Sequence, residues 1–320
     1  MKKIVLFIIA LMPFMVSCEK DKENEEDNIK INLDVTNLTD DGYFDGLLYY
    51  KVTSNSPSEV CINKADKSAV NVEIPSYIKI SGTTYKCTSI AEKAFYQHEN
   101  LTSIIIPKEV KKIGSSAFFY CGDLVSLTIS EGLENIGDFA FSGCSCLSSL
   151  TIPSSLKYLG MQSFSGCYVL SDLKVLSGVT SIGQGSFLDC IRLTSVILPE
   201  SVTRIGVVAF KGCTKLTSVI IPNSVTKIES GAFMGCSSLT TITIPENVST
   251  IGSNAFLYSN KLASIYCKAI TPPSYPDNEE EGIWFDGNVY DNATLYVPKG
   301  CSDKYQNAVD WKYFKNIVEE

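Results

Sequence analysis

The stretch "LTSVIIPNSVTKIESGAFMGCSS", residues 216–238, decides the fold, because close copies of it recur along most of the 320-residue chain. Leucine and phenylalanine each return every 23 residues without a slip. A constant period of about 20–29 residues predicts a solenoid, in which every repeat forms one coil. The leucines are Leu101, Leu124, Leu147, Leu170, Leu193, Leu216, Leu239 and Leu262, and the phenylalanines run from Phe95 and Phe118 to Phe256.

The first part of each repeat predicts a short strand. Val219 and Ile221 alternate with Ser218 and Ile220, so that one side of the strand faces the core and the other faces outward. Pro222 then ends the strand, because proline has no N–H to donate to a neighbouring strand. One repeat buries too few apolar side chains to offset the entropy lost when its backbone is ordered, so the coils must stack on one another.

The second part of each repeat predicts a turn. A second inward-facing stretch ends at Ile228, and most repeats place a glycine directly after it, as expected where the backbone has a positive φ or approaches another segment closely. Glu229 departs from this rule. An Ala-Phe pair with a cysteine three residues on then has the spacing of one short helical turn. The glycines are Gly114, Gly137, Gly160, Gly183, Gly206 and Gly252.

This pattern resembles the BspA-like leucine-rich repeat family of bacterial surface proteins. The segment "VEIPSYIKISGTTYKCTSIAEKAF" is similar to the first repeat of that family, and "TLYVPKGCSDKYQNAVDWKYFKNI" is similar to its C-terminal cap. We therefore predict a β-rich solenoid with short helical turns, built as a right-handed, leucine-rich-repeat-like stack of 23-residue repeats. Residues 78–270 would form the solenoid, and caps at 29–77, with the first strands, and at 271–320 would cover its ends.

The N-terminal segment predicts export. Two lysines precede an apolar run that is shorter than the ~20 residues needed to span a bilayer, and the run ends at Ser17 and Cys18. Residues 1–17 resemble a bacterial lipoprotein signal peptide, which implies that Cys18 is lipidated. Residues 18–28 form an acidic tether similar to the stretch that marks surface lipoproteins in the Bacteroidetes. The expected location is the outer membrane, with a lipid anchor and exposure on the cell surface.

The recurrent cysteines are interpreted as structural residues. Cysteines on adjacent coils would lie about 4.8 Å apart, which is longer than a disulfide prefers, and a linear row cannot surround a zinc ion. His98, the single histidine, occupies the same position in its repeat, so no histidine-based metal site or catalytic triad is expected. We predict no enzyme activity, no metal and no cofactor. The recurrent cysteines are Cys121, Cys144, Cys167, Cys190, Cys213 and Cys236. The sequence leaves open whether the cap cysteines form a disulfide; these are Cys61, Cys87, Cys267 and Cys301.

What remains is a surface formed by the outward side chains of the stacked strands. Solenoids use such extended surfaces for binding. Among the C-terminal aromatic residues, Trp284 is a candidate for stacking on a sugar ring, with burial in a small cap core as the alternative. The candidate ligand-binding face comprises Ser103, Ile105, Ser126, Thr128, Ser149, Thr151, Asp172, Lys174, Ser195, Ile197, Ser218, Ile220, Thr241 and Thr243.

The expected function is therefore non-covalent binding at the cell surface. The resemblance implies adhesion to host matrix proteins, host cells or other bacteria, and the alternative is capture of a surface polysaccharide or nutrient. The expected partner is a macromolecule on a host or bacterial surface, a protein more than a glycan. The protein itself is expected to be a monomer. The net charge is −8, and basic and acidic residues nearly balance within the repeats, so nucleic acid is not an expected partner.

Overall fold

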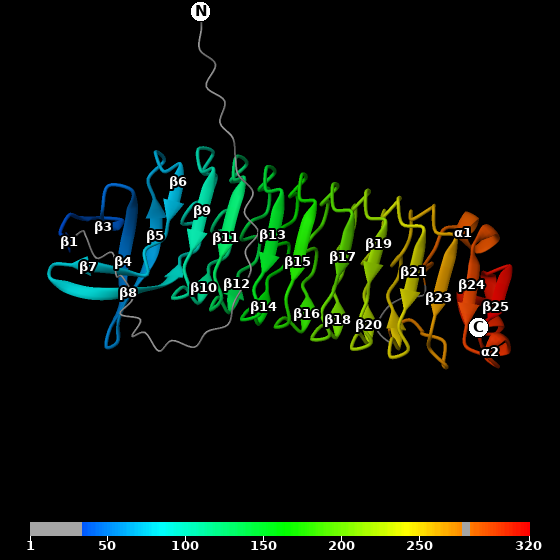
Figure 1. Ribbon diagram of the computed structural model, residues 1–320. Coiled ribbons are helices and arrows are strands. Elements are labelled where there is room, and N and C mark those ends of the chain that lie inside the picture. The colour runs from blue at the N-terminus through cyan, green and yellow to red at the C-terminus, as the bar shows by residue number, and fades with distance from the viewer. Residues whose placement is uncertain (1–33, 277–281) are drawn as a thin grey trace, which may run out of the picture.

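The computed structural model describes residues 34–276 and 282–320 and shows an elongated stack of coils between two caps (Figure 1). Each coil contributes one strand to a ladder that runs along the stack, hydrogen-bonded in groups of two to four strands. This confirms the predicted solenoid. The strands of this first ladder are β6 (Asn71–Glu73), β9 (Ser103–Ile106), β11 (Ser126–Ile129), β13 (Ser149–Ile152), β15 (Asp172–Val175), β17 (Ser195–Ile197), β19 (Ser218–Ile220), β21 (Thr241–Ile244), β23 (Ser264–Cys267), β24 (Thr294–Val297) and β25 (Asn316–Glu319).

A second ladder runs beside the first, and its strands after β8 contain two residues each. Within the repeats both ladders are parallel and keep the 23-residue register, since Ser103 lies opposite Ser126 and Lys112 lies opposite Asn135. The strands of the second ladder are β8 (Thr83–Ile90), β10 (Lys112–Ile113), β12 (Asn135–Ile136), β14 (Tyr158–Leu159), β16 (Ser181–Ile182), β18 (Arg204–Ile205), β20 (Lys227–Ile228) and β22 (Thr250–Ile251).

The Ala-Phe segment of each coil is a run of tight turns, where the sequence predicts a short helical turn. Some of its N–H groups donate hydrogen bonds within the same coil, and others donate to the next coil. The N–H of Cys121 donates to the carbonyl of Phe118 in the same coil at 3.2 Å, whereas the N–H of Phe118 donates to Ala140 of the next coil at 2.7 Å. Positive φ values at Ser116 (54°) and Tyr120 (55°) interrupt any helix. This side of the solenoid is therefore also held by hydrogen bonds between coils.

A continuous stack of phenylalanine rings fills the core. The rings from Phe95 to Phe256 are 0–1% exposed. Neighbouring ring centroids lie between 4.7 Å, at Phe118 and Phe141, and 5.9 Å, at Phe164 and Phe187. Stacked rings at this spacing bury a large apolar area in every coil and add a favourable aromatic contact.

Close backbone approach, and not a positive φ, explains the glycines that follow the second strand. A Cβ added at Gly114 would lie 2.4 Å from the backbone nitrogen of Glu92, and one at Gly206 would lie 2.7 Å from the carbonyl oxygen of Ile182. Where Glu229 replaces the glycine, its carboxylate pairs with the guanidinium of Arg204, with Nε and Oε1 2.7 Å apart.

The N-terminal cap is a set of mostly antiparallel strands that joins the second ladder through β5 and β8. Strands β7 and β8 form an antiparallel hairpin after β6, and β8 also pairs with β10 in the second ladder. The cap strands are β1 (Asp34–Val35), β2 (Leu38–Thr39), β3 (Gly42–Phe44), β4 (Leu48–Asn55), β5 (Ser58–Ala65) and β7 (Tyr77–Ile80).

The C-terminal cap continues both the first ladder and the aromatic core. Phe285 takes the next place in the ring stack, with its centroid 5.1 Å from that of Phe256. Strand β24 joins the first ladder, and helix α2 (Ser302–Gln306) follows it. Helix α1 (Gly287–Asn292), the 3-10 helix η1 (Trp311–Tyr313) and strand β25 complete the cap.

The buried hydroxyl of Ser163 generates a stability prediction. Ser163 replaces the alanine of the Ala-Phe pair, is 0% exposed, and its Oγ has no hydrogen-bond partner among the described residues. A buried hydroxyl without a partner costs about 1–3 kcal/mol. We expect Ser163→Ala to raise the free energy of unfolding by about 1 kcal/mol, measured by urea denaturation.

Ser186 is the matched control at the same position of the next repeat. It is also 0% exposed, but its Oγ donates to the carbonyl of Gly183 at 3.0 Å. Ser186→Ala should therefore not stabilise the protein. An equal gain in both variants would contradict this explanation.

Candidate functional site

The outward side chains of the first ladder form a continuous surface, here called the strand face. The sequence predicted fourteen of them between Ser103 and Thr243, and the structure places all fourteen on the outer side of their strands, with Ser103 half-buried and the others exposed. Their inward neighbours, such as Ile104 and Leu150, are buried. The alternation within each strand thus fixes the orientation of the whole surface.

The middle of the strand face combines apolar and charged side chains. Ile197 and Ile220 lie directly opposite each other on β17 and β19 and are 63% and 57% exposed. Asp172 and Lys174 project from β15, the neighbouring strand. Large apolar side chains with this exposure, next to both signs of charge, are typical of a surface that a macromolecule covers.

The strand face extends beyond the predicted residues at its C-terminal end. Tyr266 lies opposite Thr243, and Tyr296 lies opposite Tyr266. The two tyrosine rings stack with centroids 4.5 Å apart and an interplanar angle of 10°, and Lys268 Nζ lies 5.4 Å from the Tyr266 ring centroid. The sequence analysis missed this pair, although Tyr266 follows Thr243 by one 23-residue period.

Trp284 does not belong to any exposed site, and its prediction as a glycan-stacking residue is wrong. The side chain is 0% exposed and packs in the C-terminal cap against Trp311, with ring centroids 5.2 Å apart. Its indole Nε1–H donates to the carbonyl of Ile251 at 3.0 Å. The cap needs a large side chain with a donor here, so the alternative of burial in the cap core is correct.

The six repeat cysteines form a buried row of hydrogen-bond donors. Each thiol donates to the carbonyl of a phenylalanine in the preceding coil, for example Cys121 to Phe95 at 3.0 Å and Cys190 to Phe164 at 3.4 Å. Burial raises the pKa of the Cys167 thiol to about 12. Such thiols stay protonated at neutral pH, and the thiolate is the nucleophilic form.

The residues that replace cysteine at this position also contact a main-chain carbonyl. Ser259 Oγ donates to the carbonyl of Phe233 at 3.0 Å, and His98 Nε2 lies 2.8 Å from the carbonyl oxygen of Asp66. The position therefore holds a buried side chain that can donate to a main-chain carbonyl, which was not evident from the sequence. The cap cysteines Cys61, Cys87, Cys267 and Cys301 are likewise buried free thiols.

The described part of the chain holds neither a cluster of metal ligands nor a membrane-spanning helix. In residues 34–276 and 282–320, no three His, Cys, Asp or Glu side chains come together to hold a metal ion. The helices of the same residues are all too short or too polar to cross a bilayer. Cys18 and the acidic tether lie outside the described residues.

Comparison with known proteins identifies the family. The profile described as "BspA type Leucine rich repeat region" matches residues 88–217 and 180–271 and counts 6 copies, which together cover more than half of the chain. The chain belongs to this family, and family and fold are typical of repeat-based binding scaffolds. No curated protein matches the sequence.

Solved structures show the same fold. A leucine-rich repeat protein from Bacteroides ovatus ATCC 8483 matches with a TM-score of 0.59 and 20% identity over 87% of this chain and 76% of that one. A leucine-rich repeat protein of T. pallidum matches with a TM-score of 0.51 and 29% identity over 69% and 90%.

The burial of the cysteine row predicts a sharp difference in thiol reactivity. Cys146 is exposed, whereas Cys144, two residues away, is buried. We expect iodoacetamide at neutral pH to alkylate Cys146 in the native protein and to leave the six repeat cysteines unmodified, as measured by peptide mass mapping. All should react in denaturant. Alkylation of Cys190 in the native state at the rate of Cys146 would contradict the buried row.

Proposed function

We propose that this protein is a cell-surface adhesin that binds a protein of the host matrix, a host cell or another bacterium through the strand face. The observation that carries the proposal is the exposed pair Ile197 and Ile220 in the middle of an unbroken surface. An apolar centre surrounded by polar side chains is the arrangement found in protein interfaces. The proposed binding state is a monomer.

Features of the strand face favour a protein over a nucleic acid. The hydroxyl groups of its serine and threonine residues can accept and donate hydrogen bonds along the whole face. Asp172 and Lys174 add one charge of each sign, so the centre of the face has no net charge to attract phosphates. The stacked rings of Tyr266 and Tyr296 offer a further aromatic contact at one end.

The proposal includes a lipid anchor at Cys18 and display from the outer membrane. The support is the sequence of residues 1–28, where a short apolar segment ends at the cysteine and an acidic tether follows. Two or more acyl chains hold a protein stably in a membrane, since each buried methylene contributes about 0.8 kcal/mol. The tether would keep the solenoid away from the lipid surface.

A combined substitution tests the strand face. We expect Asp172→Ala, Lys174→Ala, Ile197→Ser and Ile220→Ser together to weaken binding to immobilised fibronectin, laminin or collagen by about tenfold or more, measured by surface plasmon resonance, because central interface residues dominate affinity. The matched control is Ile191→Ser with Lys227→Ala, which changes an exposed apolar and a charged residue outside the strand face. Unchanged binding in the fourfold variant would refute the strand face as the site.

A substitution of the lipidated residue tests the anchor separately. Cys18→Ala should move the protein from the membrane fraction to the soluble fraction, as followed by ultracentrifugation and immunoblotting. Cys146→Ala, which removes an exposed thiol from the solenoid, should leave the protein in the membrane fraction. If Cys18→Ala stays membrane-bound, the anchor lies elsewhere.

A further inference from the structure

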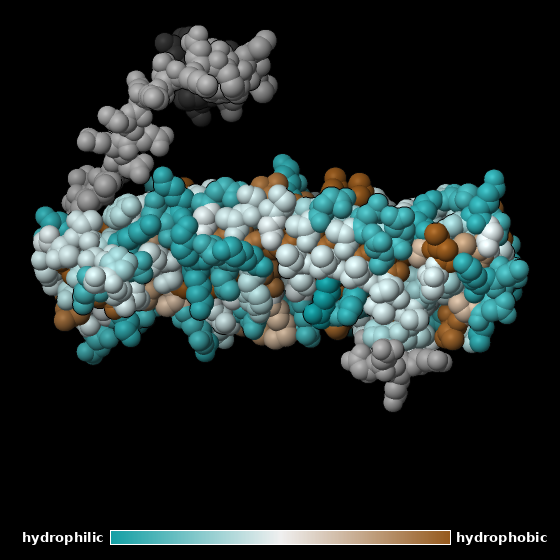
Figure 2. Space-filling model, turned by 90° about the horizontal axis from the view of Figure 1, so that it is seen from below, coloured by the Kyte–Doolittle hydropathy of each residue, from teal (hydrophilic) through white to brown (hydrophobic). Residues whose placement is uncertain are grey.

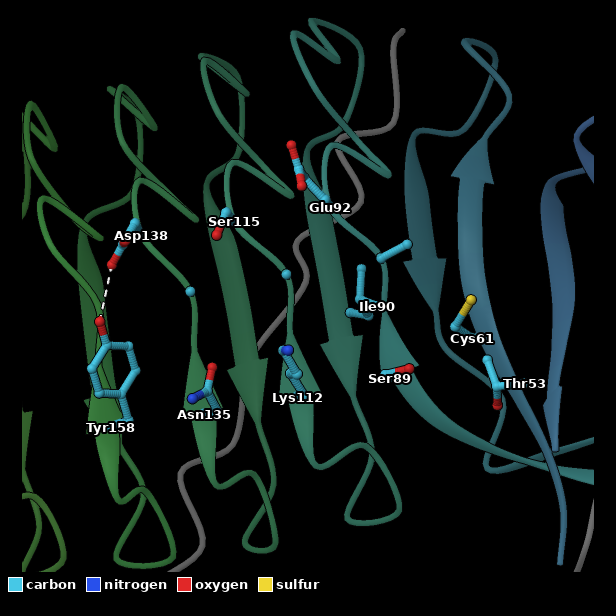
Figure 3. Close-up of a pocket in the computed structure, with 13 residues that line it drawn as sticks. Thr53, Cys61, Ser89, Ile90, Glu92, Lys112, Ser115, Asn135, Asp138 and Tyr158 are labelled. Carbon is cyan, nitrogen blue, oxygen red and sulfur yellow. Dashed lines mark hydrogen bonds between the residues drawn. The ribbon is translucent and has the colours of Figure 1, made fainter. Parts of the chain in front are cut away.

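A groove of about 460 Å³ lies on the outer side of the second ladder, next to the N-terminal cap (Figure 3). Its volume falls within the range of small-molecule sites. Thr53 of β4 and Cys61 of β5 line its end at the cap. Gly114 and Gly137 contribute no side chains to its floor. The groove crosses several coils, so an elongated ligand in it would lie along the axis of the solenoid.

Polar side chains line the groove in two rows, with one residue from each coil. The lower row comes from the second ladder and the upper row from the turns that follow it (Figure 3). This arrangement places hydrogen-bonding groups on both sides of the groove at the spacing of the coils, about 4.8 Å. The lower row comprises Ser89, Lys112, Asn135 and Tyr158, and the upper row comprises Glu92, Ser115 and Asp138.

The central groups of the lower row have no partner among residues 34–276 and 282–320. The ammonium of Lys112 and the side-chain amide of Asn135 make no hydrogen bond or ion pair with any other described residue. By contrast, Arg204, at the same position on β18, pairs with Glu229 at 2.7 Å. The groove therefore presents free donors and an acceptor, whereas the donor of Arg204 is occupied by Glu229.

Tyr158 provides an aromatic ring whose orientation is fixed. The ring is 49% exposed, and its hydroxyl donates to Asp138 Oδ1 at 3.1 Å. The same oxygen accepts the N–H of Met161 at 2.8 Å, which holds the carboxylate in place. Partial burial, followed by the nearby Asp138 charge, raises the pKa of Tyr158, so the hydroxyl stays protonated. Asp138 Oδ2 accepts no hydrogen bond from another described residue and remains available as an acceptor.

The charges of the groove restrict the ligand. Glu92 and Asp138 are acidic and Lys112 is basic, and Glu92 Oε1 pairs with Lys93 Nζ at 3.3 Å, so the groove has no net charge that would attract an anion. The groove offers an exposed aromatic ring, an amide, a carboxylate and an ammonium. A ligand that contacts all of them needs an apolar face and several groups that both donate and accept hydrogen bonds. A chain of neutral sugar rings has both properties.

We propose that this groove is a binding site for a neutral oligosaccharide, with Tyr158 stacking on a sugar ring and Asn135, Lys112 and Asp138 holding its hydroxyl groups. The site is distinct from the strand face, because it lies on the second ladder. It does not depend on the adhesin proposal. It also gives polysaccharide capture a location that the buried Trp284 does not provide.

Titration calorimetry on the full-length chain tests the site. The probes are maltohexaose, cellohexaose and mannohexaose, with tetragalacturonate as an anionic saccharide. We expect at least one neutral hexasaccharide to bind and tetragalacturonate not to bind. Tyr158→Ala should weaken the binding about tenfold, and Tyr158→Phe should weaken it less, because the ring is retained. Asn135→Ala should weaken it without changing the circular dichroism spectrum.

The matched control is Tyr168→Ala, since Tyr168 is also 49% exposed but does not line the groove. It should bind the same hexasaccharide with unchanged affinity. The proposal is overturned if no neutral hexasaccharide binds, if only tetragalacturonate binds, or if Tyr168→Ala weakens binding as much as Tyr158→Ala. The strand-face variant should keep the saccharide affinity, so failure of one proposal is distinguishable from failure of the other.

Discussion

The in-register contact between neighbouring coils is the constraint on which the structure depends. The phenylalanine rings stack at centroid distances of 4.7–5.9 Å, and glycines such as Gly114 let the backbones approach too closely for a side chain. A coil shifted by one residue would lose both contacts. Its buried strand side chains would then face solvent, and its outward side chains would face the core. Because every coil obeys the same register, side chains 23 residues apart form rows on the surface, and those rows create both proposed sites.

The strand face was predictable from the sequence because it depends only on the alternation within each strand and on the repeat period. Both are local properties that Ser218 to Ile221 display in four consecutive residues. Tyr266 obeys the same period and could have been included. Tyr296 could not, because the cap inserts residues before β24 and breaks the period, so only the strand pairing brings it beside Tyr266. The turn after the second strand was predicted as helical because spacing alone does not show that alternate N–H groups donate to the next coil.

The oligosaccharide groove was not predictable from the sequence. Strands such as β12 and β14 contain two residues each, which is too short for an alternation pattern, and the polar residues of the groove come from different repeats. Whether a charged side chain is free depends on its neighbours in the stack, as the difference between Lys112 and Arg204 shows. The hydropathy of the surface in Figure 2 varies from place to place, with hydrophobic spots separated by larger hydrophilic areas.

The last ring of the phenylalanine stack belongs to the C-terminal cap. Phe285 packs on Phe256 at 5.1 Å and 6°, much as Phe256 packs on Phe233 at 5.6 Å and 5°. The cap therefore makes the same ring contact with the last coil that one coil makes with the next. Any coil that carries this phenylalanine could take the place next to the cap. Duplication or deletion of a whole repeat in the gene would change the length of the molecule while both ends stay closed. The length of the solenoid can thus evolve in steps of one coil, independently of what the protein binds.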